Sequence, residues 1–325
     1  MNGSRAYYAS GVTVVQCVLL LITAALGSAQ DETPRTWADI AGPRLALDAS
    51  PADTVMTFAY GEGPNDLHLR YSDDPFEKVV SCYQVEVDGS IWVLPAGGAG
   101  CDTLRHFVSV AGRAEQDRAI ALRGCFHAFR VRPDGIYFST LGTRRQPAFY
   151  RLSADGNLQK QTILLGWEAE HPPANAGRLV EIRGQLYGCL HGRWVPVGDG
   201  AATDTLTHED VQPGVPGPNG EPIWQAGQII MRCTEPILDL GDGDRRSVFD
   251  TFDGGFVLVR SNVYAGGSLA RLLELYDAEG HLVRSVVVPT PAEQYGVGES
   301  GPFFITADHV YYLNLDRRRG ALLRF

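Results

Sequence analysis

Short runs of β-favouring residues, each entered through a tight turn, recur along this chain at a regular spacing. The turns stand at Asp88-Gly89, Asp134-Gly135, Arg183-Gly184, Ala226-Gly227, Asp253-Gly254 and Ala307-Asp308. Gly89 and Asp308 are 219 positions apart, which gives about 44 residues for each of the five steps. A repeat in the forties that is built from strands predicts a β-propeller with one blade per repeat.

The segment from Phe126 to Leu165 shows the expected content of one blade. Strands are predicted at residues 127–131, 136–140, 148–152 and 158–164. Tight hairpin turns need a residue with positive φ, which Gly135 and Gly156 supply between these runs. The turn sequence Leu152–Leu158 is matched by Tyr276–Leu282 in a later repeat. Each repeat is therefore predicted to be a four-stranded antiparallel meander.

The two ends of the chain indicate how the ring closes. The last repeat has only three strands before Phe325, and an isolated strand, Thr54–Tyr60, stands near the start. We predict that this strand completes the last blade, because ring closure leaves a propeller with only short, protected edges. The expected fold is all-β, a six-bladed β-propeller, with five to seven blades compatible with the uneven spacing. The outer part of the fourth blade is the hardest to assign.

The first 29 residues differ from the rest. They carry a single charge, Arg5, and are largely apolar from Gly11 to Ala25. A weakly basic start, an apolar stretch and an exit of small residues at Leu26–Ala29 are typical of a signal peptide. An uncleaved membrane anchor is the alternative, because the stretch approaches the ~18 apolar residues of a spanning helix. We therefore expect a signal peptide or anchor at 1–29, a linker at 30–52 and the propeller at 53–325. The protein is expected to be secreted, periplasmic or extracellular, or tethered to a membrane by its N-terminus.

Charge limits the partners. The chain carries a net charge of −10, and all 38 acidic residues follow residue 29. Binding of nucleic-acid phosphates requires a basic face. We therefore expect no nucleic-acid partner, and contact with a membrane only through residues 1–29.

Five cysteines follow the N-terminal segment: Cys82, Cys101, Cys125, Cys189 and Cys233. Export permits disulfides, and an odd number leaves at least one thiol outside them. Cys189 and Cys233 end the second strands of neighbouring predicted blades, so this pair is the expected bridge. A second bridge is open among the other three. The sequence holds no Cys-x-x-Cys, so it supports neither a zinc knuckle nor a thioredoxin-type site.

Three stretches resemble the NHL-repeat type of six-bladed propeller: Phe58–Pro64, Val85–Val93 and Tyr150–Gly156. The resemblance extends over about residues 53 to 325 and is one of blade pattern. It implies a fold that sugar-lactone hydrolases, lyases and plain binding modules share, so the fold does not select a function.

In such a fold the inner strands line a central channel, and one face carries the ligand. The stretches expected near that channel and face include 81–84, 125–130, 178–181, 222–225, 249–251 and 301–305. A lactonase-like propeller draws carboxylates and amides from inner strands onto a divalent cation. The residues that fit this pattern are Gln84, Glu181, Gln225 and Asp250, with His127 as a base. Solvated or hydrogen-bonded polar groups are the alternative interpretation of the same residues.

A second metal hypothesis rests on the acidic turn Asp239–Asp244. Asp239, Asp242 and Asp244 could hold Ca²⁺, although the spacing of an EF-hand loop is absent. A plain polar turn explains the same residues, and no cofactor is firmly indicated. The sequence also lacks His-Glu-x-x-His and Gly-x-Ser-x-Gly, so it supports neither zincin nor α/β-hydrolase chemistry.

Two functions remain in competition. The first is a secreted or surface-tethered, non-catalytic propeller that binds a protein, peptide or glycan partner. The second is a divalent-metal-dependent hydrolase or lyase of the lactonase-like type. A channel mouth lined by aromatic groups such as Phe126, Trp224 and Phe304 would favour binding, whereas a cluster of unpaired carboxylates and amides would favour catalysis.

Overall fold

The computed structural model describes residues 45–67, 78–95, 103–122, 126–141, 147–153, 156–164, 178–190, 193–198, 205–206, 212–241, 246–290, 296–297, 301–316 and 318–325. They belong to one compact unit, Arg44–Phe325, whose regular elements are all β-strands. The predicted signal peptide or anchor lies outside the described residues. Within the described ranges, no helix has the length and apolar character needed to cross a bilayer.

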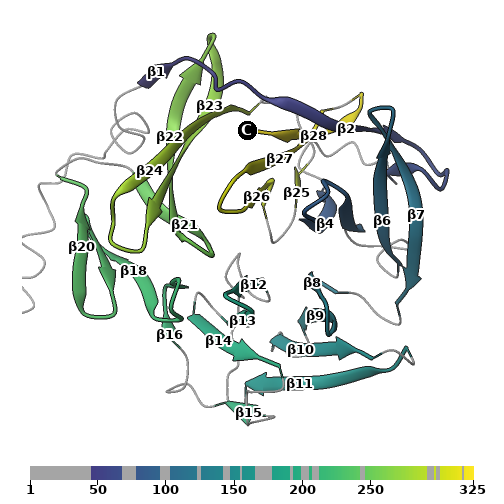
Figure 1. Ribbon diagram of the computed structural model, residues 1–325, viewed down its shortest axis with the longest axis horizontal. Helices are drawn as coiled ribbons and strands as arrows, with labels where there is room; N and C mark the ends of the chain where they lie inside the picture. The colour runs from purple at the N-terminus through teal and green to yellow at the C-terminus, as the bar shows by residue number, and fades with distance from the viewer. Residues whose placement is uncertain are drawn as a thin grey trace, which may run out of the picture. The chain divides into compact units, whose positions relative to one another are not determined.

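The strands form six successive blades, which we number 1 to 6 (Figure 1); blades 1 and 6 are joined by a short pairing of their outer strands. Blade 1 contains β4 (Lys78–Val85), β5 (Ile91–Pro95), β6 (Thr103–Val110) and β7 (Arg113–Ala121). Blade 2 contains β8 (Ala128–Arg132), β9 (Gly135–Leu141), β10 (Pro147–Leu152) and β11 (Leu158–Leu164). Blade 3 contains β12 (Leu179–Ile182), β13 (Gln185–Leu190), β14 (Arg193–Val197) and β16 (Gln212–Pro213).

Blade 4 contains β17 (Val215–Pro216), β18 (Pro222–Ala226), β19 (Ile229–Arg232) and β20 (Glu235–Asp239). Blade 5 contains β21 (Arg246–Phe252), β22 (Gly255–Ala265), β23 (Ser268–Asp277) and β24 (Leu282–Pro289). Blade 6 contains β26 (Phe303–Ile305), β27 (Val310–Leu315), β28 (Gly320–Arg324) and β2 (Asp53–Tyr60). The predicted six-bladed propeller is confirmed.

The predicted ring closure is also confirmed. β2, from the start of the chain, pairs antiparallel with β28 and so becomes the outer strand of blade 6. An ion pair between Asp53 and Arg324, with the nitrogen and oxygen 3.1 Å apart, joins the two strands near the chain end. The hydrogen bonds of β28 therefore continue into β2 instead of ending at an open sheet edge.

A separate apolar cluster fills the interface of each neighbouring pair of blades. Phe58 and Leu322 of blade 6 pack with Tyr83 and Val93 of blade 1. The other five clusters join blades 1 and 2, 2 and 3, 3 and 4, 4 and 5, and 5 and 6. Because each sheet buries both faces against neighbours, its strands read as short apolar runs on the sequence.

The repeated turn seen in the sequence has the same geometry in two blades. Gly156 donates a backbone hydrogen bond to Ser153 O at 2.9 Å, and Gly280 donates one to Asp277 O at 3.2 Å. The φ angles are +81° at Gly156 and +87° at Gly280, values that side chains disfavour. The glycine in each turn is therefore required by the backbone.

Blade 4 differs from the other five. The inner strands β4, β8, β12, β21 and β26 contact one another in a closed ring, in which β12 of blade 3 contacts β21 of blade 5 directly. Figure 1 shows these five strands around the centre, with β18 and β20 farther out. Val215 of β17 packs on Trp194 and Val180 of blade 3, while Ile223 of β18 packs on Phe256 of blade 5. Blade 4 thus fills the outer gap between blades 3 and 5.

Four short strands add to this frame: β1 (Leu45–Leu47), β3 (Asp66–Leu67), β15 (Thr205–Leu206) and β25 (Gly296–Val297). β1 lies in the stretch expected to be a linker. It pairs parallel with Val263–Ala265 of β22, and Leu45 and Leu47 pack on the outer part of blade 5. The turn signals and prolines of residues 30–52 gave no indication of this pairing, because a three-residue strand has no detectable period.

Candidate functional site

The five inner strands enclose a small cavity at the centre of the ring, which we call the central cavity. Its volume is ≈ 30 Å³, and each inner strand contributes to its wall. The lining includes Tyr83, Arg130, Arg178, Asp250, Thr251 and Phe304. All lining residues fall within stretches that the sequence placed near the channel and ligand face, and among the described residues none comes from blade 4. The side chains that line the cavity therefore come from blades 1, 2, 3, 5 and 6.

An ion pair between Arg178 and Asp250 crosses the cavity wall from blade 3 to blade 5. The two side chains are 10% and 8% exposed, so solvent screens their charges little. Asp250 also accepts a hydrogen bond from the backbone of Thr251 at 2.8 Å. The carboxylate predicted as a metal ligand is thus engaged with a cation of the protein.

A second arginine, Arg130 of β8, lies in the same cavity. Its guanidinium stands 5.2 Å from the centre of the Phe304 ring in a cation–π contact. Its Nε is buried without a hydrogen-bond partner. Burial lowers the pKa of Arg130, yet a guanidinium stays protonated in proteins at neutral pH.

Tyr83 of β4 also lines the cavity. Its hydroxyl donates to Pro302 O at 2.8 Å, and its ring centre lies 6.1 Å from that of Phe304. Burial raises the pKa of Tyr83 well above its ordinary value, so the phenol is neutral. The central cavity therefore combines two arginines, one carboxylate and aromatic rings.

A larger pocket, which we call the side pocket, lies at the junction of blades 3, 4 and 5. Its volume is ≈ 380 Å³. Most of its wall is apolar or aromatic, formed by Trp194, Val215, Ile223, Trp224, Val248 and Phe249. Arg178 lines both the side pocket and the central cavity. The displaced position of blade 4 thus coincides with the larger pocket.

The amides predicted as metal ligands instead link neighbouring blades. The amide of Gln84 in β4 donates to Val131 O at 3.0 Å and accepts from Val131 N at 2.8 Å. Gln225 of β18 reaches β21 in a similar way, donating to Arg246 O at 3.2 Å and accepting from Val248 N at 3.3 Å. Both amides fasten one blade to the backbone of the next.

The remaining predicted residues lie apart from one another. Glu181 forms an ion pair with Arg132 of blade 2 at 3.7 Å, and Trp224 lines the side pocket, where its indole donates to Cys233 O at 2.8 Å. The backbone of His127 donates to Ser139 O at 3.0 Å. In the described ranges, no group of three or more His, Cys, Asp or Glu residues is arranged to hold a metal ion.

The acidic turn is only partly described. Asp239 accepts a hydrogen bond from Gly241 N at 2.8 Å, as in a plain polar turn. Asp242 and Asp244 lie outside the described residues, so Ca²⁺ binding by this turn stays a prediction.

Cys189 and Cys233, the pair predicted to form a disulfide, are not joined to each other in the structure. Cys189 is buried in the apolar interface of blades 3 and 4, beside Trp194 and Val180. Cys233 stands in the turn between β19 and β20 as a free, exposed thiol. Positions at the ends of equivalent strands do not ensure facing side chains, because one of these faces a core and the other solvent. Cys101 and Cys125 lie outside the described residues.

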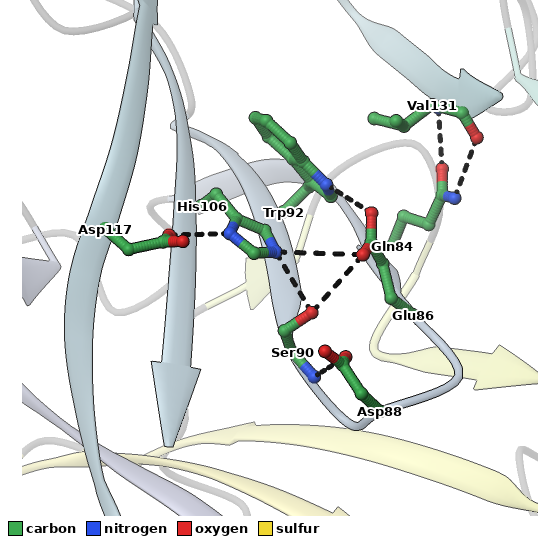
Figure 2. A network of polar contacts seen from close by, with 8 residues as sticks. All are labelled: Gln84, Glu86, Asp88, Ser90, Trp92, His106, Asp117 and Val131. Atoms are coloured by element: carbon green, nitrogen blue, oxygen red, sulfur yellow. Dashed lines mark hydrogen bonds and ion pairs between the residues drawn. The ribbon is translucent and has the colours of Figure 1, made fainter. Parts of the chain in front are cut away.

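Sequence reasoning missed a polar network inside blade 1, which Figure 2 shows. His106 of β6 lies between Asp117 of β7 and Ser90, with Nδ1 2.6 Å from the carboxylate and Nε2 3.0 Å from the hydroxyl. Glu86 accepts the indole N–H of Trp92 at 2.7 Å and lies 3.5 Å from the Ser90 hydroxyl. The order Asp–His–Ser matches that of a hydrolase triad.

The surroundings of this network favour a structural role. Ser90 is 4% and His106 6% exposed, so a substrate has no access to the hydroxyl. The Glu86 carboxylate beside Ser90 would repel the oxyanion of acyl transfer, which needs hydrogen-bond donors. We therefore interpret the network as a set of satisfied buried polar groups that ties the strands of blade 1 together.

Comparisons with known proteins give only distant likenesses. No known family profile matches the sequence, and no curated protein matches it. The chain is similar to a candidate 6-phosphogluconolactonase from Bacteroides uniformis ATCC 8492, with a TM-score of 0.40 and 15% identity over 72% of this chain and 77% of that chain. A candidate 6-phosphogluconolactonase from Bacteroides fragilis NCTC 9343 gives a TM-score of 0.34 and 13% identity over 72% of this chain and 76% of that chain. BamB from Moraxella catarrhalis gives a TM-score of 0.34 and 10% identity over 87% of this chain and 96% of that chain. At these identities and TM-scores, none of the three likenesses carries an argument about this chain.

Proposed function

We propose that this protein is an exported or surface-tethered, non-catalytic binding propeller. Its side pocket would take an apolar or aromatic side chain of a protein or peptide partner. The observation that carries the proposal is the side pocket itself, ≈ 380 Å³ in volume and walled by Trp224, Trp194 and Phe249. Ligand pockets of about 300–1,000 Å³ are mostly apolar, with a few placed polar groups.

The polar groups of the pocket favour an apolar occupant over a glycan. Arg178 is engaged with Asp250, and Gln225 with the backbone of blade 5. A sugar would bring hydroxyl groups that need their own partners. Trp224 supplies apolar area and a ring fixed by its hydrogen bond to Cys233 O, which suits an anchor residue of an interface.

The competing metal-dependent hydrolase or lyase would need converging ligands. In the described part of the chain Asp250, Gln84 and Gln225 are each engaged with other groups of the protein. Metal analysis of the purified full chain, with melting curves before and after chelator, separates the two functions. Stoichiometric Ca²⁺ or Zn²⁺ and a lower melting temperature after chelation would favour the hydrolase.

The binding proposal is tested by selecting peptides from a random displayed library on the immobilised full chain. We expect selected peptides to share an apolar or aromatic residue. Their affinity should fall by about tenfold or more for Trp224→Ala, because truncating a central aromatic anchor costs about 2 kcal/mol or more. Val283→Ala is the matched control, since Val283 is an exposed apolar residue of blade 5. Selection of no peptide, or equal binding to both variants, would overturn the proposal.

A further inference from the structure

Arg130 has a position that ordinary folding requirements do not explain. It lies on an inner strand, in a cavity bounded by five blades, with its guanidinium over the Phe304 ring. Its Nε is buried and makes no hydrogen bond. As a whole Arg130 is only partly buried, but a charge held in the wall of a cavity is normally paired or hydrogen-bonded. Within the described part of the chain, no hydrogen bond or ion pair involves Arg130.

The other arginines near this region are paired. Arg178 pairs with Asp250, and Arg132, two positions from Arg130 on β8, pairs with Asp134 at 3.2 Å. The charged residues that line the central cavity are Arg130, Arg178 and Asp250, which is an excess of one positive charge. Glu181, which pairs with Arg132, also acts electrostatically on Arg130. A cavity with this charge favours an anion.

The size of the cavity narrows the choice of anion. A buried water molecule requires roughly 10–15 Å³ of cavity volume. The central cavity, at ≈ 30 Å³, therefore accommodates about two atoms of the size of a water oxygen. A planar carboxylate presents two oxygens and accepts two parallel N–H bonds from a guanidinium. Phosphate and sulfate carry four oxygens around a tetrahedral centre and need more of this space than the two oxygens of a carboxylate, whose remaining atoms would have to extend out of the cavity.

We propose that the central cavity is a carboxylate-binding site, in which the unpaired guanidinium of Arg130 forms a bidentate contact with the ligand. Arg178 is held by Asp250 beside that position. The Phe304 ring holds the Arg130 guanidinium by its face and leaves the edge of the fork for the carboxylate. The carboxylate belongs either to a small organic acid or to a peptide, and the experiment distinguishes the two sources.

The first measurement is the broadening of the NMR signal of ¹³C-labelled acetate when the full chain is added. Melting temperatures of the full chain are then compared in sodium acetate, sodium chloride and sodium phosphate at constant ionic strength. We expect saturable broadening, and a melting temperature that rises with acetate more than with the other salts, because a ligand of the folded state stabilises it. Arg130→Met should abolish both effects. Arg113→Met is the matched control with the same change of charge, since Arg113 is exposed on β7.

A second variant, Arg130→Lys, keeps the charge and removes the fork. Acetate affinity should fall by about tenfold, as expected when one of two charge-assisted hydrogen bonds is lost. This variant keeps the test decisive if Arg130→Met does not fold. Acetate binding that is equal in wild type, Arg130→Met and Arg130→Lys, or a preference for chloride or phosphate, would overturn the proposal.

Two further experiments distinguish a small organic acid from a peptide as the ligand, and the central cavity from the side pocket as its site. Short peptides with free and amidated C-termini, titrated against acetate broadening, show whether a peptide carboxylate reaches the cavity. If only acetate competes, the ligand is a small acid. Trp224→Ala should leave acetate binding unchanged, because Trp224 lines the side pocket alone. Failure of the peptide-binding proposal therefore leaves this one standing, and the reverse also holds.

Discussion

The ion pair between Arg178 and Asp250 allows a quantitative test of how the ring is held together. The two residues join blade 3 to blade 5, and their side chains are 10% and 8% exposed. Because both side chains are this deeply buried, the energetic cost of breaking the pair should be that of an ion pair in a protein interior. Breaking such a pair by removing one partner costs about 3–5 kcal/mol, because the other charge stays buried without compensation.

The perturbation is Asp250→Asn. The amide oxygen of asparagine keeps an acceptor for the Thr251 backbone N–H, which donates to Asp250 at 2.8 Å. What is lost is the negative charge, which leaves Arg178 and Arg130 together in one cavity. We expect a fall of about 3–5 kcal/mol in the free energy of unfolding. At roughly 2 °C per kcal/mol for a domain of this size, the melting temperature should fall by about 6–10 °C.

The assay is urea unfolding followed by circular dichroism, completed as a double-mutant cycle with Arg178→Met. Removing both charges should cost far less than the sum of the single changes, because well-packed apolar replacements of buried pairs are often neutral. A cost below about 1 kcal/mol for Asp250→Asn, which is the value of an exposed pair, would refute the reasoning. So would a double variant whose cost equals the sum of the two single costs.

Two other groups give independent tests. Burial and the hydrogen bond to Asp134 raise the pKa of Tyr137 to about 12, so this phenol stabilises the fold below pH ~10 and the contribution is lost as pH rises from about 10 to 12. Tyr137→Phe should lose less stability than wild type over that range, measured as urea midpoints at several alkaline pH values; parallel losses would contradict this. His106→Ala should lower the unfolding free energy by about 1–3 kcal/mol, because Ser90 and Asp117 then lose their buried partner. An unchanged midpoint in thermal unfolding would contradict the structural role of that network.

The blade architecture could be predicted because it depends on local signals. Glycines such as Gly156 and Gly280 mark turns that only a positive φ permits, and short apolar runs between them mark strands buried on both faces. The closing strand was predictable because an unpaired run at one end matched a missing strand at the other. The outer position of blade 4 could not be predicted, because its strand β17 has only two residues and depends on contacts with blades 3 and 5.

The candidate site was only partly predictable. The sequence predicted the right stretches near the channel, but the residues it pointed to there were carboxylates and amides that could bind a metal. Gln84 and Gln225 turned out to bind backbone of the next blade, a role that depends on register across blades and leaves no local signal. Arg130 was missed, although an arginine directly after Phe129 on a predicted inner strand was a visible signal.

Closure of the ring by β2 has a consequence for the timing of folding. Asp53 and Arg324, which meet across β2 and β28, are 271 positions apart. The strand made early in synthesis cannot find its partner until the last residues have left the ribosome. Until then the side of β2 that faces β28 is unpaired, and β2 carries Met56 and Phe58, which belong to the core between blades 6 and 1. The entropic cost of closing a loop grows only slowly with its length, so the long separation of β2 and β28 lowers stability little. Its main effect is on the folding rate, because contacts between residues distant in sequence form slowly. Completion of blade 6 is therefore expected to be a late step of folding.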